Sequence, residues 1–141
     1  EPEGRNTAPA AIVAALQVAG SDPEGLVLLV PSDHAVADPA AFRAAVEQGR
    51  VAAETGQIVT FGIQPQRAEI GYGWLEAGKQ THPGVYHLER FIEKPNAARA
   101  AELFADPRYL WNAGVFLAQA KTLIAAFADE ARRCTYGGGE A

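Results

Sequence analysis

A short apolar run that ends at a proline constrains the fold of this chain more than any other feature. Residues 26–30 are all leucine or valine, and Pro31, Ser32, Asp33 and His34 follow them directly. A run that is apolar on both faces is typical of a strand buried in a parallel sheet. Ligands of open α/β sheets bind beyond the carboxyl ends of such strands. Asp33 is therefore expected where a metal ion or a phosphate group can bind.

The segments around this strand alternate between helical and extended patterns. Residues 7–19 are rich in alanine and apolar all round, which predicts a mostly buried helix. Asp38 is expected to cap a second helix, and the β-branched and aromatic residues of 57–63 predict a second strand. The order helix, strand, helix, strand indicates a crossover connection, and such a connection joins the strands of a parallel sheet.

The second half of the chain is expected to contain three further strands and two further helices. The predicted strands are 72–76, 85–91 and 109–117, with a polar loop over 78–84, and the predicted helices are a short one capped by Asn96 and another over 120–131. Residues 132–141 are expected to form a loose C-terminal tail, because the last of them have no apolar period. We find no repeat or linker that would divide the chain, and we expect one α/β domain.

The charge of the chain argues against some classes of ligand. The 141 residues carry a net charge of −5, and the pI is about 5.1. This acidic balance gives no support for binding to nucleic acid or to a membrane surface, so a phosphate-rich ligand has to meet local cations, backbone amides or a metal ion. No run approaches the roughly 18 apolar residues that span a bilayer. The single cysteine, Cys134, excludes an internal disulfide, and we expect a cytoplasmic protein.

Six short motifs occur in order along the chain. They are residues 1–10, 30–34, 60–63, 71–74, 91–95 and 109–114, and they read EPEGRNTAPA, VPSDH, TFGI, GYGW, FIEKP and YLWNAG. By these motifs the chain resembles the mannose-1-phosphate guanylyltransferases of the sugar-nucleotide pyrophosphorylase family. The resemblance implies a Rossmann-like nucleotidyltransferase fold, in which helices flank a mostly parallel mixed sheet. It also implies that GTP and mannose 1-phosphate react to give GDP-mannose and pyrophosphate.

The same resemblance predicts a fragment that is incomplete at both ends. Residues 1–131 would form a partial nucleotidyltransferase domain, followed by the tail at 132–141. The family's glycine-rich signature, which binds the triphosphate, should lie before residue 1, and a second metal-binding aspartate should lie after residue 141. We therefore expect these residues alone to be inactive. Ile70, Asn96 and Ala113 replace a threonine, an aspartate and a serine that are usual in the family, and all three changes are mild.

Asp33 is the candidate metal ligand, and the resemblance makes it a catalytic and nucleotide-binding residue as well. Phosphoryl transfer depends on positioning the reactants and on neutralising the phosphate charge, so a carboxylate that binds Mg²⁺ is the expected catalytic group. The alternative is an aspartate that caps a turn after the strand, and spacing alone does not decide between the two interpretations. His34 either orients Asp33 or has a purely structural role.

Arg5, Asn6 and Thr7 stand where a loop is expected to enter the first helix. Backbone amides and polar side chains at such an entry can meet a polar ligand. The resemblance assigns these residues to guanine recognition, and the alternative is helix capping by Asn6 or Thr7.

Four residues of the later motifs are assigned to the sugar phosphate by the resemblance. Gly73 would offer its amide to the hexose, and Glu93 would accept hydrogen bonds from hexose hydroxyls. Lys94 would pair with the phosphate as a point charge, which makes it a catalytic residue. Asn112 would contact a sugar hydroxyl. The alternatives are a glycine turn, an exposed ion pair at a strand end and an asparagine in a tight turn.

Two alternatives to a mannose-1-phosphate guanylyltransferase stay open. One is a guanylyltransferase or other nucleotidyltransferase for a different hexose or heptose 1-phosphate, and the other is a sugar-nucleotide-binding module without catalysis. The expected partners are GTP, mannose 1-phosphate and GDP-mannose, with Mg²⁺ as the cofactor, and neither nucleic acid nor a membrane is expected. A homo-oligomer is compatible with the sequence.

Overall fold

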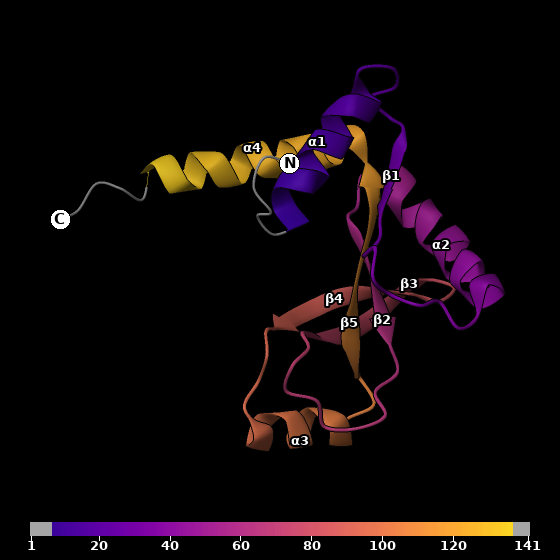
Figure 1. Ribbon diagram of the computed structural model, residues 1–141, viewed down its shortest axis with the longest axis vertical. Helices are drawn as coiled ribbons and strands as arrows, with labels where there is room; N and C mark the ends of the chain where they lie inside the picture. The colour runs from indigo at the N-terminus through magenta and orange to yellow at the C-terminus, as the bar shows by residue number, and fades with distance from the viewer. Residues whose placement is uncertain (1–6, 137–141) are drawn as a thin grey trace. The chain divides into compact units, whose positions relative to one another are not determined.

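The computed structural model describes residues 7–136, and within them the chain forms four helices and five strands (Figure 1). In chain order these are α1 (Thr7–Ala19), β1 (Leu26–Leu29), α2 (Pro39–Glu54), β2 (Val59–Ile63), β3 (Trp74–His82), β4 (Val85–Ile92), α3 (Ala97–Ala105), β5 (Tyr109–Gln119) and α4 (Ala120–Tyr136). None of these four described helices combines the length and the apolar character that crossing a bilayer requires.

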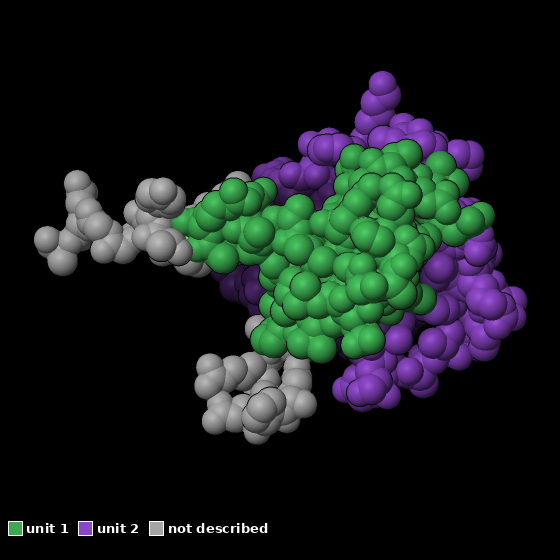
Figure 2. Space-filling model, turned by 90° about the horizontal axis from the view of Figure 1, so that it is seen from above, with its two compact units in different colours: residues 1–29, 50–59, 116–141 green, residues 30–49, 60–115 purple. Residues whose placement is uncertain are grey.

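The chain divides into two compact units, each made of segments that are separated in sequence (Figure 2). The first unit comprises residues 1–29, 50–59 and 116–141, and the second unit comprises residues 30–49 and 60–115. One division between the units falls inside β5, after residue 115, so β5 contributes residues to both units. The segments of the two units interleave along the chain, so the units do not correspond to two successive stretches of sequence. The prediction of one domain over residues 1–131 therefore stays a prediction.

The core of the first unit forms where α1 packs against α4 and β1. Its buried residues are all small or aliphatic: Ala15, Val27, Ala118, Ala120 and Leu123. Short side chains such as that of Ala15 allow neighbouring elements to approach closely. β1 adds an antiparallel ladder with β5, which runs from Leu26 opposite Gln119 to Leu29 opposite Phe116.

Helix α1 has the predicted bounds, but it is not mostly buried. Ala11 and Ala15 are its buried residues, whereas Val13 and Leu16 are 64% and 57% exposed. Within the described residues, α4 and β1 pack against α1 on the face of Ala15, and the apolar side chains of its other face meet no core. Apolar residues on all faces of a predicted helix do not show how many of those faces other elements cover.

The core of the second unit is built around two tryptophans. Trp74 of β3 and Trp111 of β5 stand opposite each other in an antiparallel ladder and meet edge to face, with ring centroids 6.2 Å apart. Leu103 of α3 and Tyr109 of β5 complete this core, and Ile92 at the end of β4 packs against it. The core therefore draws on three strands and one helix.

Two helix caps in the second unit are those that the sequence predicts. Asp38 Oδ1 accepts hydrogen bonds from the backbone N–H groups of Ala40 at 3.1 Å and Ala41 at 3.0 Å, at the start of α2. Asn96 Oδ1 accepts one from the backbone N–H of Arg99 at 2.8 Å, at the start of α3. These contacts satisfy amides that have no partner inside the helix.

The strand directions correct the predicted sheet. The ladders β1–β5, β3–β4 and β3–β5 are all antiparallel, so the prediction of a mostly parallel sheet is wrong for these pairs. The two strands of the predicted crossover, β1 and β2, both pair with β5. Because β5 comes late in the chain, its pairing with these early strands leaves no local signature in the sequence.

Strand β3 extends beyond its predicted end. It continues to His82, so most of the predicted polar loop over 78–84 is strand, and a tight turn at Gly84 joins β3 to β4. The ladder between β3 and β4 contains several register shifts between Glu76 and His82. These irregularities break the alternation of polar and apolar residues by which a strand is recognised.

Helix α4 also extends beyond its predicted end. It continues to Tyr136, so the first part of the predicted tail over 132–141 is helical. Arginine is a good helix former, and the two arginines that follow the alanine-rich stretch allow the helix to continue. Residues 137–141 lie outside the described residues.

Candidate functional site

The loop after β1 carries Asp33, the candidate metal ligand. Pro31, the second residue of this loop, lies beside β5, since a Cβ atom added to Gly114 would be 3.5 Å from Pro31 Cγ. Gly114 has a φ of +70°, a conformation that residues with a side chain rarely adopt. Asp33 lies in a turn and is exposed, as a ligand for an incoming group must be. Asp33 thus follows β1, and its role as a metal ligand stays a prediction.

Three of the predicted sugar-phosphate residues come together in the second unit. The backbone N–H of Asn112 donates a hydrogen bond to the backbone oxygen of Gly73 at 2.8 Å. A Cβ atom on Gly73 would lie 3.3 Å from Glu93 Oε2 and 2.8 Å from Phe91 Cζ. Gly73 therefore has no room for a side chain, and the Glu93 carboxylate lies against its backbone.

The side-chain amide of Asn112 is held by the protein at its oxygen. Asn112 Oδ1 accepts hydrogen bonds from Thr60 Oγ1 at 3.1 Å and from Gly114 N at 3.1 Å. Among the described residues Nδ2 has no acceptor, so this group can donate to a ligand oxygen. Sequence reasoning missed Thr60, because the hydroxyl of a strand residue gives no local sign of a partner on a distant strand.

Lys94 has a strained backbone next to a carboxylate. Its φ is +38°, and it is the one residue other than glycine with a positive φ in the part of the chain that the structure describes. This conformation costs about 1–2 kcal/mol for a residue with a Cβ atom, so the surrounding structure has to impose it. Lys94 Nζ lies 3.7 Å from Glu93 Oε1, and both side chains are largely exposed. Backbone strain of this kind is concentrated at ligand-binding sites.

The predicted guanine-binding residues are only partly described. Thr7 is the first residue of α1 and belongs to the first unit. Arg5 and Asn6 lie outside the described residues. The guanine contacts of all three residues therefore stay predictions.

Three residues before β3, Arg67, Glu69 and Gly71, form a group that we call the Glu69 cluster. Gly71 belongs to a motif that the sequence analysis identified, whereas Arg67 and Glu69 were missed. Glu69 Oε2 accepts a hydrogen bond from Arg67 Nε at 2.9 Å, and Glu69 Oε1 accepts one from Gly71 N at 2.9 Å. The hydrogen bond from Gly71, followed by that from Arg67, lowers the pKa of the Glu69 carboxyl. The available sequence signal was an arginine and a glutamate two residues apart, with only Ile70 between the glutamate and the Gly-Tyr-Gly motif.

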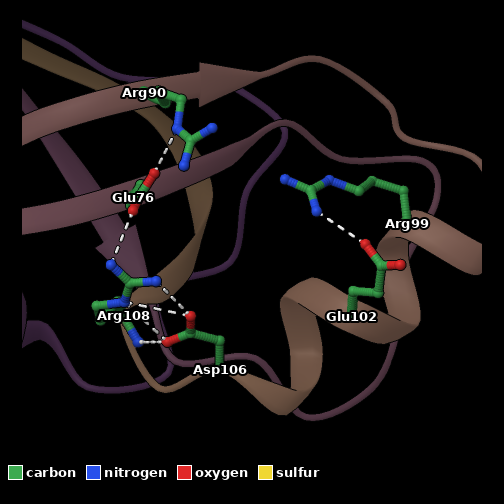
Figure 3. A network of polar contacts seen from close by, with 6 residues as sticks. All are labelled: Glu76, Arg90, Arg99, Glu102, Asp106 and Arg108. Carbon is green, nitrogen blue, oxygen red and sulfur yellow. Dashed lines mark hydrogen bonds and ion pairs between the residues drawn. The ribbon is translucent and has the colours of Figure 1, made fainter.

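A second polar group that sequence reasoning missed, the Glu76 cluster, consists of Glu76, Arg90, Asp106 and Arg108 (Figure 3). The Glu76 side chain is 5% exposed, and its carboxylate accepts a hydrogen bond from Arg90 Nε at 2.6 Å and lies 3.1 Å from Arg108 Nη1. Arg108 also pairs with Asp106 at 2.7 Å. The hydrogen bond from Arg90 is the main cause that lowers the pKa of the Glu76 carboxyl. A buried carboxylate needs such partners, so this cluster ties β3 to β4 and to the start of β5.

A cavity of about 620 Å³ lies beside the Glu76 cluster. Its lining residues are Glu76, Ala77, Gly78, Glu89, Arg90 and Arg108. Three of its four charged groups are paired within the Glu76 cluster, and Glu89 Oε1 lies 3.4 Å from Nδ1 of His87. Because most of its charges are already paired, and because no predicted site residue lines it, the cavity does not identify a ligand.

The metal prediction can be compared with the donor groups that the structure holds. Among the described residues, no group of three or more His, Cys, Asp or Glu side chains is arranged to hold a metal ion. Mg²⁺ is often held by one or two carboxylates together with waters and substrate phosphates. The exposed carboxylate of Asp33 therefore fits one protein ligand of a substrate-bound Mg²⁺, and the described residues do not form a closed metal site.

Known proteins resemble the chain over nearly its whole length. The family described as nucleotidyl transferase matches residues 1–134. The xanthan biosynthesis protein XanB of Xanthomonas campestris pv. campestris (strain B100) is 45% identical over 145 residues, which cover 98% of this chain and 31% of that protein. The mannose-1-phosphate guanylyltransferase of Escherichia coli (strain K12) is 43% identical over 126 residues, which cover 85% of this chain and 26% of that protein.

A solved structure agrees with these sequence matches. A crystal structure from Thermus thermophilus, described as a mannose-1-phosphate geranyltransferase, matches with a TM-score of 0.84 and 34% identity, over 99% of this chain and 43% of that one. This chain belongs to the nucleotidyl transferase family, and the predicted α/β nucleotidyltransferase fold is confirmed. It spans less than a third of the length of the two curated relatives named above.

Proposed function

We propose that this chain is part of a guanylyltransferase that converts GTP and mannose 1-phosphate into GDP-mannose and pyrophosphate. The observation that carries the proposal is the grouping of Gly73, Glu93 and Asn112, with Lys94 beside Glu93. Membership of the nucleotidyl transferase family supports the reaction type, and a relative of 43% identity is itself named a mannose-1-phosphate guanylyltransferase.

The proposed reaction is a displacement at phosphorus. A phosphate oxygen of mannose 1-phosphate forms a bond to the α-phosphorus of GTP, while the bond from that phosphorus to the bridging oxygen breaks. The bridging oxygen leaves with the electron pair as part of pyrophosphate. A reaction of this type is accelerated mainly by positioning and by charge neutralisation, so it requires no covalent intermediate with the protein.

Each residue of the group has chemistry that suits one part of a sugar phosphate. Glu93 accepts hydrogen bonds from sugar hydroxyls, and Asn112 donates one through Nδ2, because its oxygen is already engaged. Lys94 supplies a cation for the phosphate, and its imposed backbone conformation restricts where that cation lies. Gly73 lacks a side chain, which leaves room for the Phe91 ring and the Glu93 carboxylate beside its backbone.

Asp33 is proposed to hold Mg²⁺ as one of its ligands, and Arg5, Asn6 and Thr7 are proposed to contact guanine. The exposure of Asp33 in the loop after β1 supports the first assignment. The position of Thr7 at the first residue of α1 supports the second, because the N-terminal end of a helix favours polar and negatively charged groups. Mg²⁺, when bound, would neutralise phosphate charge and favour the departure of pyrophosphate.

Pyrophosphate release by the intact protein tests the proposal. With GTP and Mg²⁺, mannose 1-phosphate is expected to be turned over in preference to glucose 1-phosphate, because Glu93 and Asn112 would read the hexose hydroxyls. A preference for glucose 1-phosphate or for a heptose 1-phosphate would replace the mannose assignment. Binding of GDP-mannose without any pyrophosphate release would instead favour a sugar-nucleotide-binding module without catalysis.

A further inference from the structure

The segment that leads into the candidate hexose site has no regular secondary structure. It comprises residues 64–73, between β2 and β3. At its end, the backbone oxygen of Gly73 accepts the hydrogen bond from Asn112 N. Because no strand ladder fixes residues 64–72, their conformation depends on individual contacts of side chains and amides.

Glu69 makes several of these contacts at once. Its carboxylate accepts the hydrogen bond from Gly71 N at 2.9 Å and pairs with Arg67 Nη2 at 2.8 Å. Its backbone oxygen accepts a hydrogen bond at 2.9 Å from the indole N–H of Trp74, which is fully buried. Glu69 thus joins the start of the Gly-Tyr-Gly run to the core of the second unit.

Arg67 and Tyr72 connect the same segment to β5. The Arg67 guanidinium lies over the ring of Trp111, 5.4 Å from its centroid, and the Tyr72 ring meets Trp111 edge to face at 5.3 Å. These cation–π and aromatic contacts favour one placement of the two side chains. Trp111 is the residue directly before Asn112, so the contacts bring the segment to the strand position next to the candidate hexose contact.

We propose that Glu69 is a positioning residue for the hexose phosphate: its carboxylate holds residues 71–73 so that Gly73 and Asn112 keep the arrangement that receives the sugar. The inference rests on the proposed function, and Glu69 acts through Gly71 and Arg67. An ionised acceptor makes a stronger hydrogen bond than a neutral one. The partners of Glu69 lower the pKa of its carboxyl, so the charged form is present at neutral pH.

Steady-state kinetics of the intact protein test this role. Glu69→Ala is expected to raise the KM for mannose 1-phosphate about tenfold, the effect of one lost charge-assisted hydrogen bond, and to leave the KM for GTP within about twofold. Glu69→Gln keeps an oxygen that can accept from Gly71 N, and we expect it to recover part of the loss. An equal rise of both KM values in Glu69→Ala, or no rise in either, would overturn the proposal.

Glu102→Ala is the matched control. Glu102 also pairs with an arginine, Arg99, at 2.8 Å, and its side chain is more exposed than that of Glu69. It belongs to α3 and, among the described residues, makes no hydrogen bond or ion pair with the Glu69 cluster. Its removal is expected to leave both KM values unchanged. A similar rise of the KM for mannose 1-phosphate in this variant would mean that any lost carboxylate of the second unit has the same effect.

Amide hydrogen exchange separates this inference from the proposed function. Glu69→Ala is expected to speed exchange at the Gly71 N–H and to leave the β3–β4 hairpin unchanged, and this measurement needs no turnover. If the unsubstituted protein releases no pyrophosphate, the proposed function fails, whereas faster exchange at Gly71 still supports the positioning of this segment by Glu69. Unchanged exchange at Gly71 would reject it whatever the activity. Glu69→Gln, which keeps the shape of the side chain, provides the same comparison with smaller changes if Glu69→Ala does not fold.

Discussion

Lys94 combines a strained backbone with the charge that the proposed reaction needs. Its φ of +38° would suit glycine, yet the position carries a lysine whose ammonium lies near Glu93. A structural role would be served better by a glycine, because glycine adopts this conformation without strain. Under the proposed function the strain is the cost of placing a cation at this point, and stability and activity should then respond to its removal in opposite directions.

Lys94→Gly is expected to stabilise the fold slightly and to weaken function strongly. Relief of the left-handed strain contributes about 1 kcal/mol to the free energy of unfolding, and the greater freedom of glycine in the unfolded chain offsets part of it. The kcat/KM for mannose 1-phosphate should fall about a hundredfold, because a charge-assisted hydrogen bond to the phosphate is lost. Urea unfolding and steady-state kinetics of the intact protein measure the two effects.

Lys79→Gly is the matched control for this prediction. Lys79 is an exposed lysine within β3, and its φ is not positive. A glycine there should lower the free energy of unfolding by about 0.5–1 kcal/mol and leave kcat/KM unchanged. If Lys94→Gly lowers stability as much as Lys79→Gly does, or keeps full activity, the strain at Lys94 does not serve the site.

At the scale of the elements, local chemistry was predictable and long-range pairing was not. Asp38 and Asn96 could be identified as caps because each bonds to amides only two or three residues away. The length of β3 could not be predicted, since its register shifts are defined only against β4. The antiparallel pairing of β1 with β5 joins Leu29 to Phe116, and no window of local sequence contains both residues.

The cap of α3 gives a prediction at this scale. Asn96→Ala is expected to lower the free energy of unfolding by about 1 kcal/mol, because the Arg99 N–H loses the oxygen to which it donates at 2.8 Å. Asn96→Asp should be at least as stable as the parent, since a carboxylate caps well and is favoured near a helix N-terminus. The midpoint of urea unfolding measures both variants. Equal midpoints for Asn96→Ala and the parent would mean that the capping bond does not contribute to the stability of α3.

At the scale of the whole molecule, the order of the motifs located the candidate residues, but it did not show which contacts fix their positions in the fold. Gly73 and Asn112 come from motifs far apart in sequence, and the structure joins them by one backbone hydrogen bond. The side chains that support this contact, Thr60 and Glu69, were not predicted. Their partners lie on other strands or on the backbone of an irregular segment, and a single sequence does not reveal such contacts.

The two units could not be predicted for a similar reason. Each core gathers side chains from segments that are distant in sequence, as Ala15 with Leu123 in the first unit and Trp74 with Leu103 in the second. Local hydrophobic patterns report that such residues are apolar, but not which of them share a core. The stability of the second unit also depends on paired carboxylates, and this dependence can be examined through pH.

The pKa values of Glu69, Glu76 and Asp106 are all lowered in the folded protein, mainly by hydrogen bonds from Gly71, Arg90 and Arg108 respectively. Unfolding returns these carboxyls to their ordinary values, 4.5 for glutamate and 3.8 for aspartate. The unfolded chain therefore binds more protons in acid than the folded chain does. Their contribution to the free energy of unfolding is fully present above these ordinary values, and it is lost as the pH falls through the lowered values of the folded state.

Glu76→Gln tests this dependence at the most buried of the three carboxyls. The variant is expected to be less stable than the parent at neutral pH, because the charge that pairs with Arg90 and Arg108 is gone. Below the ordinary glutamate value of 4.5, its stability should fall less steeply than that of the parent, since one carboxyl no longer takes up a proton on unfolding. Urea midpoints from about pH 7 to about pH 3 give both curves. Parallel curves would show that Glu76 takes no part in the acid sensitivity of the fold.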